Sequence, residues 1–136
     1  MIKNLPEFLR RMNKRVVEKP EKEVKKLITE ATLLVRGSAV SSILRDPKTG
    51  QIYGNHIASA PGEAPASDTG FLANNIMFDV NDSSGEVVGY VTSSAPYSAA
   101  LEFGTRNIAP RPFMQPALEK NISKIERKFT KGGLIK

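Results

Sequence analysis

Residues 95–120, APYSAALEFGTRNIAPRPFMQPALEK, decide the fold because they hold two helix signals separated by a sharp reversal. Apolar residues recur at helical spacing from Tyr97 to Phe103, which predicts a short amphipathic helix. Gly104 should end this helix, since glycine adopts the positive φ of a C-cap without a Cβ clash. The two prolines that follow force the residues before them into an extended conformation.

The chain beyond these prolines is predicted to form a second helix. Its apolar residues follow helical spacing, namely Phe113, Met114, Leu118, Ile122, Ile125 and Phe129. Pro116 is tolerated because the first turn of a helix lacks acceptors for its N–H groups. The helix should run to Lys131, end at two glycines and leave a few flexible residues. Its cationic residues suit the helix dipole and need no ligand to explain them.

Two motifs in the chain carry a family resemblance. One begins at Tyr97 and reads LEFGT over residues 101–105, then RPFMQPAL over residues 111–118. The other lies upstream and reads GEAPA over residues 62–66, then TGFLA over residues 69–73. In composition and order they resemble the tail-completion, or head–tail joining, family of long-tailed bacteriophages. The resemblance is weakest over the N-terminal third, where only a helical pattern is shared.

The resemblance implies a structural virion protein that joins the assembled tail to the DNA-filled head. In that role the protein forms a ring of six copies, coaxial with the tail tube, through which genomic DNA passes without specific binding. One face would bind a head-side connector or stopper protein, and the other a tail terminator or tail tube protein. The expected location is the neck of the virion, after assembly in the host cytoplasm.

Composition excludes several classes of protein. At 136 residues and 40% apolar content, the chain is long enough for one small domain with a modest core. It has no cysteine, which excludes disulfides, thiolate zinc sites and thiol nucleophiles. No apolar run follows the first charges, so we expect no signal peptide. No window is expected to reach the roughly 18 apolar residues of a membrane span, so no membrane partner is predicted.

Charge is segregated along the chain. Residues 1–45 carry eleven Lys and Arg against five Asp and Glu, whereas residues 46–100 carry one against six. Residues 101–136 again carry more basic than acidic residues, with eight Lys and Arg against three Asp and Glu. Basic ends can bind nucleic acid or complement acidic surfaces on other proteins, but a solvated surface explains them as well. The alternative function is therefore a small basic DNA-binding protein, although no recognition helix with clustered base-reading side chains is evident.

Two helices are predicted before the sheet. The first covers residues 4–19, with Asn4 as N-cap and Pro6 in its first turn. The second follows Pro20 and runs to about Leu44, with a continuous apolar seam. Small residues near its end allow close approach of a neighbouring backbone, either the sheet of the same chain or a helix of another subunit.

Residues 45–70 are predicted to be a long loop. They contain four glycines and three prolines, which argue against regular structure apart from a brief strand at residues 51–53. A loop this long in a compact domain is usually functional or disordered, so it either contacts a partner or has no role. His56, the one histidine, has neither a cysteine nor an evident nucleophile beside it, which argues against a zinc or catalytic site.

A β-hairpin is predicted over residues 75–92. Ile76, Phe78 and Val80 alternate onto one face, and residues 81–85 have the composition of a hairpin loop. A hairpin is only marginally stable alone, so we expect the long helix over one face and residues 51–53 as a third strand. Three carboxylates surround the turn (Asp79, Asp82 and Glu86). Their spacing lacks the ligand density of a calcium loop and favours a solvated tip.

The predicted fold class is α+β. Two N-terminal helices pack on a small antiparallel sheet, followed by a short helix and a C-terminal helix. Residues 1–136 form a single domain with a helical region over 1–44, a long loop over 45–70, and the hairpin and C-terminal helices over 71–136.

No catalytic constellation is found, and we predict neither enzymatic activity nor a cofactor or metal site. Glu102 either fixes the adjacent turn through a charge-assisted hydrogen bond, with Arg106 and Arg111 nearby, or pairs with an arginine of the next subunit. Phe113 is either core or an anchor in a neighbour's pocket. The predicted subunit or partner interface comprises Tyr97, Glu102, Phe103, Gly104, Thr105, Arg106, Arg111, Pro112 and Phe113.

Overall fold

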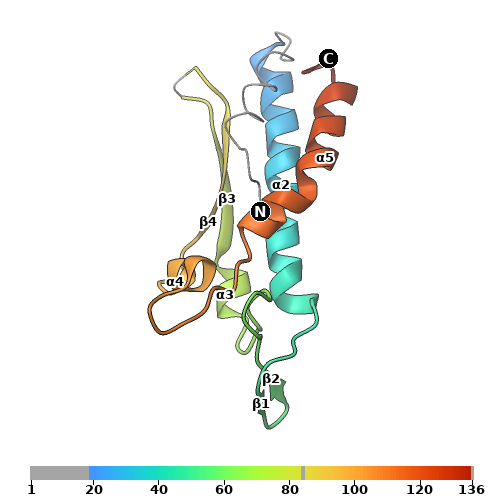
Figure 1. Ribbon diagram of the computed structural model, residues 1–136. Coiled ribbons are helices and arrows are strands. Elements are labelled where there is room, and N and C mark those ends of the chain that lie inside the picture. Colours follow the sequence, from blue (N-terminus) through green and yellow to red (C-terminus); the bar gives the residue numbers. More distant parts are fainter. Residues whose placement is uncertain (1–18, 84, 136) are drawn as a thin grey trace.

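The computed structural model describes residues 19–83 and 85–135, and Figure 1 shows their arrangement. The described elements are α2 (Glu21–Arg45), β1 (Ile52–Tyr53), β2 (His56–Ile57), α3 (Phe71–Asn74), β3 (Ile76–Asn81), β4 (Val88–Ser93), α4 (Ser98–Phe103) and α5 (Gln115–Lys131). The α+β class is confirmed. One long helix precedes the sheets, and the helix predicted over residues 4–19 lies, but for Lys19, outside the described residues.

Helix α2 is the spine of the molecule, with the β3–β4 hairpin on one side and α5 on the other (Figure 1). It follows Pro20 and carries Glu21 and Glu23 in its first turn, where carboxylates favour the positive end of the dipole. Asp46 ends it in an extended conformation, because proline follows. The second predicted helix is therefore confirmed.

Length and composition would allow α2 to cross a membrane, because an 18-residue window within it has a mean hydropathy of 1.3. The expectation that no window is apolar enough is therefore wrong. Part of the helix's apolar surface packs within the chain, where Ala39 and Ile43 belong to the main core.

The β3–β4 hairpin packs on α2 through the face predicted from its alternation. Phe78 pairs with Val91 and Val80 with Gly89 in the antiparallel register. Gly89 lies so close to α2 that a Cβ there would collide with Thr32 Oγ1. The absence of a side chain at Gly89 is what allows the strand and the helix to approach.

Two polar contacts fasten this hairpin to α2. Arg36 Nε donates to the Ile76 carbonyl at 2.9 Å, and its guanidinium lies 6.0 Å from the centre of the Phe78 ring. Lys25 Nζ forms an ion pair with Asp82 at 3.2 Å. Asp82 is thus bound to a lysine, which accounts for one carboxylate of the acidic turn without a metal.

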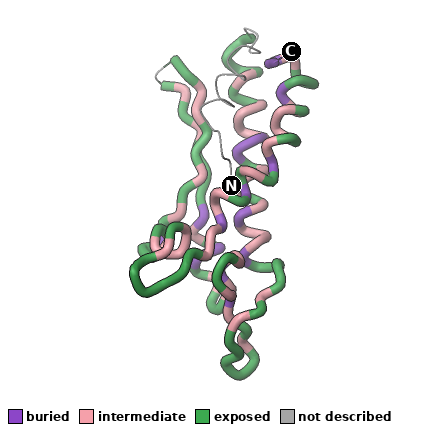
Figure 2. Tube along the Cα trace, viewed as in Figure 1, coloured by how far each residue is buried: buried purple, intermediate pink, exposed green. Residues whose placement is uncertain are grey.

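The prediction of a third strand in this sheet is wrong. Ile52 pairs with Ile57, and Tyr53 with His56, in a separate two-stranded sheet. The chain reverses at Gly54, whose φ is 62°, so β1 meets β2 before it could reach the larger hairpin. Residues 45–70 therefore contain a small hairpin, which projects from the lower end of the molecule and is largely exposed (Figure 2).

Two buried clusters hold α2 to the rest of the chain. The first gathers Ala39, Ile43, Leu72, Ala73, Ile76, Ala95, Phe113 and Ala117. Ala39 is fully buried there, and Asn121 Nδ2 of α5 donates to Ser38 Oγ at 2.7 Å. The small residues of α2 thus admit elements of the same chain, but the partner at Ser38 is helix α5, whereas the alternatives predicted were the sheet of the same chain and a helix of another subunit.

The second cluster is formed by Ala31, Phe129, Leu134 and Ile135. The glycines after Lys131 end α5 as predicted, and Gly133 has a φ of 77°. The chain then turns back, and the Leu134 N–H donates to the Phe129 carbonyl at 2.8 Å. Leu134 and Ile135 are buried, in contrast to the flexible end expected from the two glycines.

Substitution of Gly89 tests the close contact between β4 and α2. Gly89→Ala should lower the free energy of unfolding by about 1–3 kcal/mol, since Thr32 cannot make room without shifting the strand. Gly37→Ala is the matched control: Gly37 lies within α2 with no atom near its missing Cβ, so the change should stabilise by roughly 0.5–1 kcal/mol. Urea unfolding measures both, and a Gly89→Ala protein as stable as the wild type would contradict the packing described.

Candidate functional site

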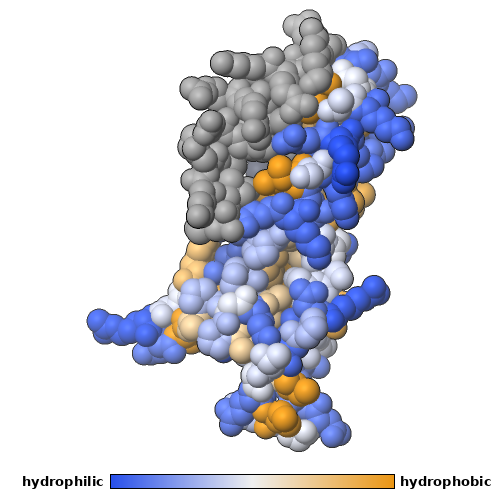
Figure 3. All heavy atoms as spheres, turned by 45° about the vertical axis from the view of Figure 1, so that its right-hand side comes forward, coloured by the Kyte–Doolittle hydropathy of each residue, from blue (hydrophilic) through white to orange (hydrophobic). Residues whose placement is uncertain are grey.

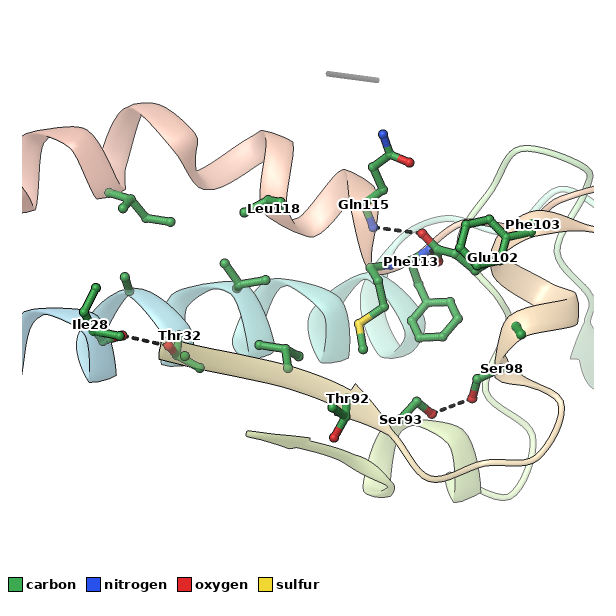
Figure 4. Close-up of a pocket in the computed structure, with 17 residues that line it drawn as sticks. Ile28, Thr32, Thr92, Ser93, Ser98, Glu102, Phe103, Phe113, Gln115 and Leu118 are labelled. Carbon is green, nitrogen blue, oxygen red and sulfur yellow. Dashed lines mark hydrogen bonds between the residues drawn. The ribbon is translucent and has the colours of Figure 1, made fainter. Parts of the chain in front are cut away.

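The Glu102 carboxylate caps the N-terminus of α5. Its Oε2 accepts hydrogen bonds from the backbone N–H groups of Phe113 and Met114 at 2.8 and 3.0 Å, and its Oε1 accepts one from Gln115 at 2.9 Å (Figure 4). The residue at the N-cap position of α5, Met114, provides no side-chain cap. A carboxylate from α4 therefore satisfies donors that a helix start leaves unpaired, at the positive end of its dipole.

The connection between α4 and α5 is folded so that Phe113 returns to Glu102. Gly104 ends α4 with a φ of 76°, and a Cβ there would lie 2.9 Å from the Ile108 carbonyl oxygen. Thr105 then closes a tight turn, donating its N–H to that carbonyl at 2.8 Å and accepting the Ile108 N–H on Oγ1 at 3.1 Å. The Gly-Thr pair that the sequence singled out is what reverses the chain.

Glu102 thus has the intrachain role that the sequence left as one of two alternatives. The donors are backbone amides of α5, whereas the sequence pointed to the neighbouring arginines. The amides were missed because nothing in the local sequence brings residue 113 to residue 102; only the turn at Gly104 does. Pairing of Glu102 with an arginine of another subunit stays a prediction.

Arg111 fastens the segment just before the upstream motif to the connection between α4 and α5. Its Nε and Nη2 donate to the Ser59 carbonyl at 3.3 and 3.4 Å, and its Nη1 donates to that of Ala109 at 3.1 Å. The Gly62 N–H, in the upstream motif, donates to the Pro110 carbonyl at 2.9 Å. Segments some fifty residues apart in sequence therefore lie side by side.

The remaining predicted interface residues divide into buried and exposed groups. Phe113 is 1% exposed and belongs to the core, so the core alternative describes it. Phe103 is 76% exposed at the end of α4. Tyr97 is also exposed and packs its ring 6.2 Å from that of Phe71. Pro112 is half-buried beside Phe113, and Arg106 is exposed on the tight turn.

An apolar groove of about 920 Å³ runs beside this junction, between α2, β4, α4 and α5 (Figure 4). Ile28, Thr32 and Val35 of α2 form its floor, with Val91 and Leu118 among the lining residues of β4 and α5. Only four of the 25 residues of α2 are buried (Ala31, Thr32, Ala39 and Ile43). The sequence signalled this surface by the unbroken apolar seam of the helix, but not that Ile28 and Val35 of the seam are only half-buried.

The second exposed apolar feature is the tip of the β1–β2 hairpin. Ile52, Tyr53 and Ile57 are 67%, 59% and 45% exposed. Figure 3 shows hydrophobic atoms on the projection at the foot of the molecule. The sequence of residues 45–70 predicts a strand here, but not that its apolar side chains are exposed at a tip.

A network at the base of this hairpin ties it to the body. Glu63 accepts the N–H groups of Thr49 and Ala60 at 2.9 and 2.6 Å, and the Thr49 hydroxyl at 2.8 Å. Lys48 Nζ donates to the carbonyls of Ser42 and Ala64 at 2.8 and 2.9 Å. The backbone donors hold the pKa of Glu63 below its ordinary value, and burial lowers that of Lys48.

A comparison with known families decides the class of protein. Residues 6–104 match the family described as "Bacteriophage HK97-gp10, putative tail-component". The chain belongs to this family. The matched residues include the upstream motif and extend through Gly104, and they confirm the resemblance to phage tail proteins. No curated protein and no solved structure matches the chain.

Membership of the HK97-gp10-like family supports a structural, tail-related role in a phage virion. Proteins of such a family are building blocks of a particle and are not typically enzymes. The groove and the apolar tip are therefore the candidate surfaces for assembly in this structure.

Loss of the Glu102 cap should weaken the fold. Glu102→Ala leaves three N–H groups of α5 without their acceptor and should lower the free energy of unfolding by about 1–3 kcal/mol. Glu102→Gln keeps one acceptor oxygen and should lower the free energy of unfolding by less than Glu102→Ala does. Urea unfolding of the two variants measures the difference; equal stability of Glu102→Ala and wild type would show that the cap does not hold α5.

Acid should loosen the base of the β1–β2 hairpin. The lowered pKa of Glu63 means that its contribution is complete above 4.5, its ordinary value, and is lost as the pH falls through the lower value of the folded protein. The amide shifts of Thr49 and Ala60 should therefore move with a midpoint below 4.5 in an NMR titration. Glu63→Gln should abolish that transition, whereas a midpoint at or above 4.5 would contradict the network.

Proposed function

We propose that the protein is a ring-forming tail-completion component that joins the phage tail to the DNA-filled head. The observation that carries the proposal is the family match over residues 6–104 together with the motifs typical of head–tail joining proteins. The ring, the position at the neck and the joining step are what the proposal adds to a tail-related role.

The distribution of apolar side chains supports assembly. Among the described residues, thirteen large apolar side chains are exposed, whereas twelve apolar residues are buried and five of those are alanine. Three of the exposed side chains, Ile52, Tyr53 and Ile57, gather on one small hairpin, and clustered exposed apolar surface is typical of sites that bind a partner. A ring requires two different surfaces on each copy, since only a head-to-tail interface whose rotation closes gives a cycle.

Charge segregation supports a defined orientation within the ring. The acidic middle of the chain and its basic C-terminal region lie on different elements, so they can face each other across copies. Electrostatic complementarity of this kind fixes register and speeds encounter more than it adds affinity. The proposed partners above and below the ring are a head-side connector or stopper protein and a tail terminator or tube protein.

Particles made without the protein test the joining role. We expect full heads and complete tails to accumulate separately, and purified protein added to the extract to restore joined particles. The Phe103→Ser variant should restore them at least tenfold less well, since it removes an exposed apolar side chain, while Ser123→Ala, also on the surface, should work like the wild type. Joined particles, free heads and free tails are counted by electron microscopy.

Three outcomes would contradict the proposal. Absent or truncated tails would place the protein in tail building, and intact particles would show that it is dispensable. Binding of the purified protein to duplex DNA, with affinity that falls steeply with salt, would favour the small basic DNA-binding protein instead.

A further inference from the structure

We infer that the apolar tip of the β1–β2 hairpin in one copy inserts into the α2–β4–α5 groove of the next copy. This contact rests on the proposed ring and gives it a specific interface. The tip consists of Ile52, Tyr53 and Ile57, and the groove is the apolar cleft floored by Ile28 and Val35.

The tip is suited to insertion because it is both apolar and fixed. Its three large side chains stand out from the body, yet the Glu63 and Lys48 networks hold the base of the hairpin. Gly50 packs so tightly that a Cβ would lie 2.6 Å from the Ser59 carbonyl oxygen. A projection ordered in advance loses little conformational entropy when it docks, which favours binding.

The groove offers the complementary surface. It has a volume of about 920 Å³, within the range of roughly 300–1,000 Å³ for clefts that enclose apolar ligands. Apolar atoms make up most of its lining surface, and Leu118 at its α5 wall is exposed. Glu102, the one ionisable side chain among the described lining residues, is held by backbone amides at the start of α5, and the Ser93 and Ser98 hydroxyls bond each other, so these polar groups already have partners within the chain.

A copy cannot fill its own groove with its own tip. The groove is floored near Thr32, whereas the hairpin follows the end of α2 at Arg45, thirteen residues or about 20 Å further along the helix. The β1–β2 hairpin then projects beyond the lower end of α2, whereas β4 and α5, which line the groove, lie alongside α2 (Figure 1). Tip and groove are different surfaces facing different directions, as a head-to-tail interface requires.

Charge complementarity favours a second copy as the occupant. Residues 46–68, which carry the tip, hold three carboxylates against one lysine, whereas α5 holds five cations against two carboxylates. Docking brings the acidic base of the hairpin toward the basic helix that forms one wall of the groove. Unlike charges at the rim orient the tip while the apolar side chains fill the cleft.

Cysteine pairs test the contact directly, because the natural chain has no cysteine. Tyr53→Cys protein mixed with Leu118→Cys protein should form mixed disulfide dimers on oxidation, at least tenfold above the control pair of Tyr53→Cys with Ser123→Cys. Ser123 is exposed on another face of α5, outside the groove. Equal yields from both pairs, or Tyr53→Cys dimers formed as readily alone, would overturn the inference.

A second variant separates this inference from the ring itself. Ile52→Ser with Tyr53→Ser should abolish the oligomer but leave a folded monomer, whose unfolding midpoint should match that of the wild type diluted until it dissociates, since both side chains are exposed. An oligomer that survives this change would overturn the tip contact and leave the ring standing, whereas a wild-type chain with no oligomer would count against both. A groove filled by residues 1–18 of the same chain would protect the Leu118→Cys thiol from alkylation in dilute monomer and prevent the mixed disulfide, which also overturns the inference.

Discussion

The capping of α5 by the Glu102 carboxylate is the interaction on which the rest of the structure depends. Three backbone N–H groups at the start of α5 share one side chain from α4, so the two helices and the turn between them form one unit. That unit positions Phe113 in the main core and directs α5 along α2. The groove between α2, β4, α4 and α5 lies beside this junction, and Glu102 and Gln115 are among the residues that line it.

A few hydrogen bonds also fix the lower end of the molecule. Arg111 and the Gly62–Pro110 hydrogen bond fasten residues 45–70 to the α4–α5 connection, while Glu63 and Lys48 fix the β1–β2 hairpin. A stretch rich in glycine and proline thus becomes a supported projection. The apolar tip and the apolar groove, which the proposed head-to-tail contact would join, lie on either side of this polar framework.

The predictable parts of this structure were those encoded over short distances. The seam of α2, the alternation of Ile76, Phe78 and Val80, and the glycines at positions 104 and 132–133 gave the main elements and their ends. The pairing of residues 51–53 was not predictable, because which strand lies next to another depends on the whole chain path. The carboxylate of Glu102 was correctly singled out, but its amide partners lie eleven to thirteen residues further along the chain and are brought back only by the turn at Gly104. The burial of Leu134 and Ile135 depends on Phe129 and α2, and composition alone gives no sign of it.

The mass of the protein in solution, measured by light scattering on a size-exclusion column at low and high salt, tests the account most directly. Apolar surfaces that dock in series, oriented by unlike charges, should give one discrete closed species of about six copies. That species should weaken as salt screens the charges at its interfaces. A monomer at every protein concentration and both salt concentrations would contradict assembly through the chain's own surfaces, and an open distribution of sizes would contradict a closed ring.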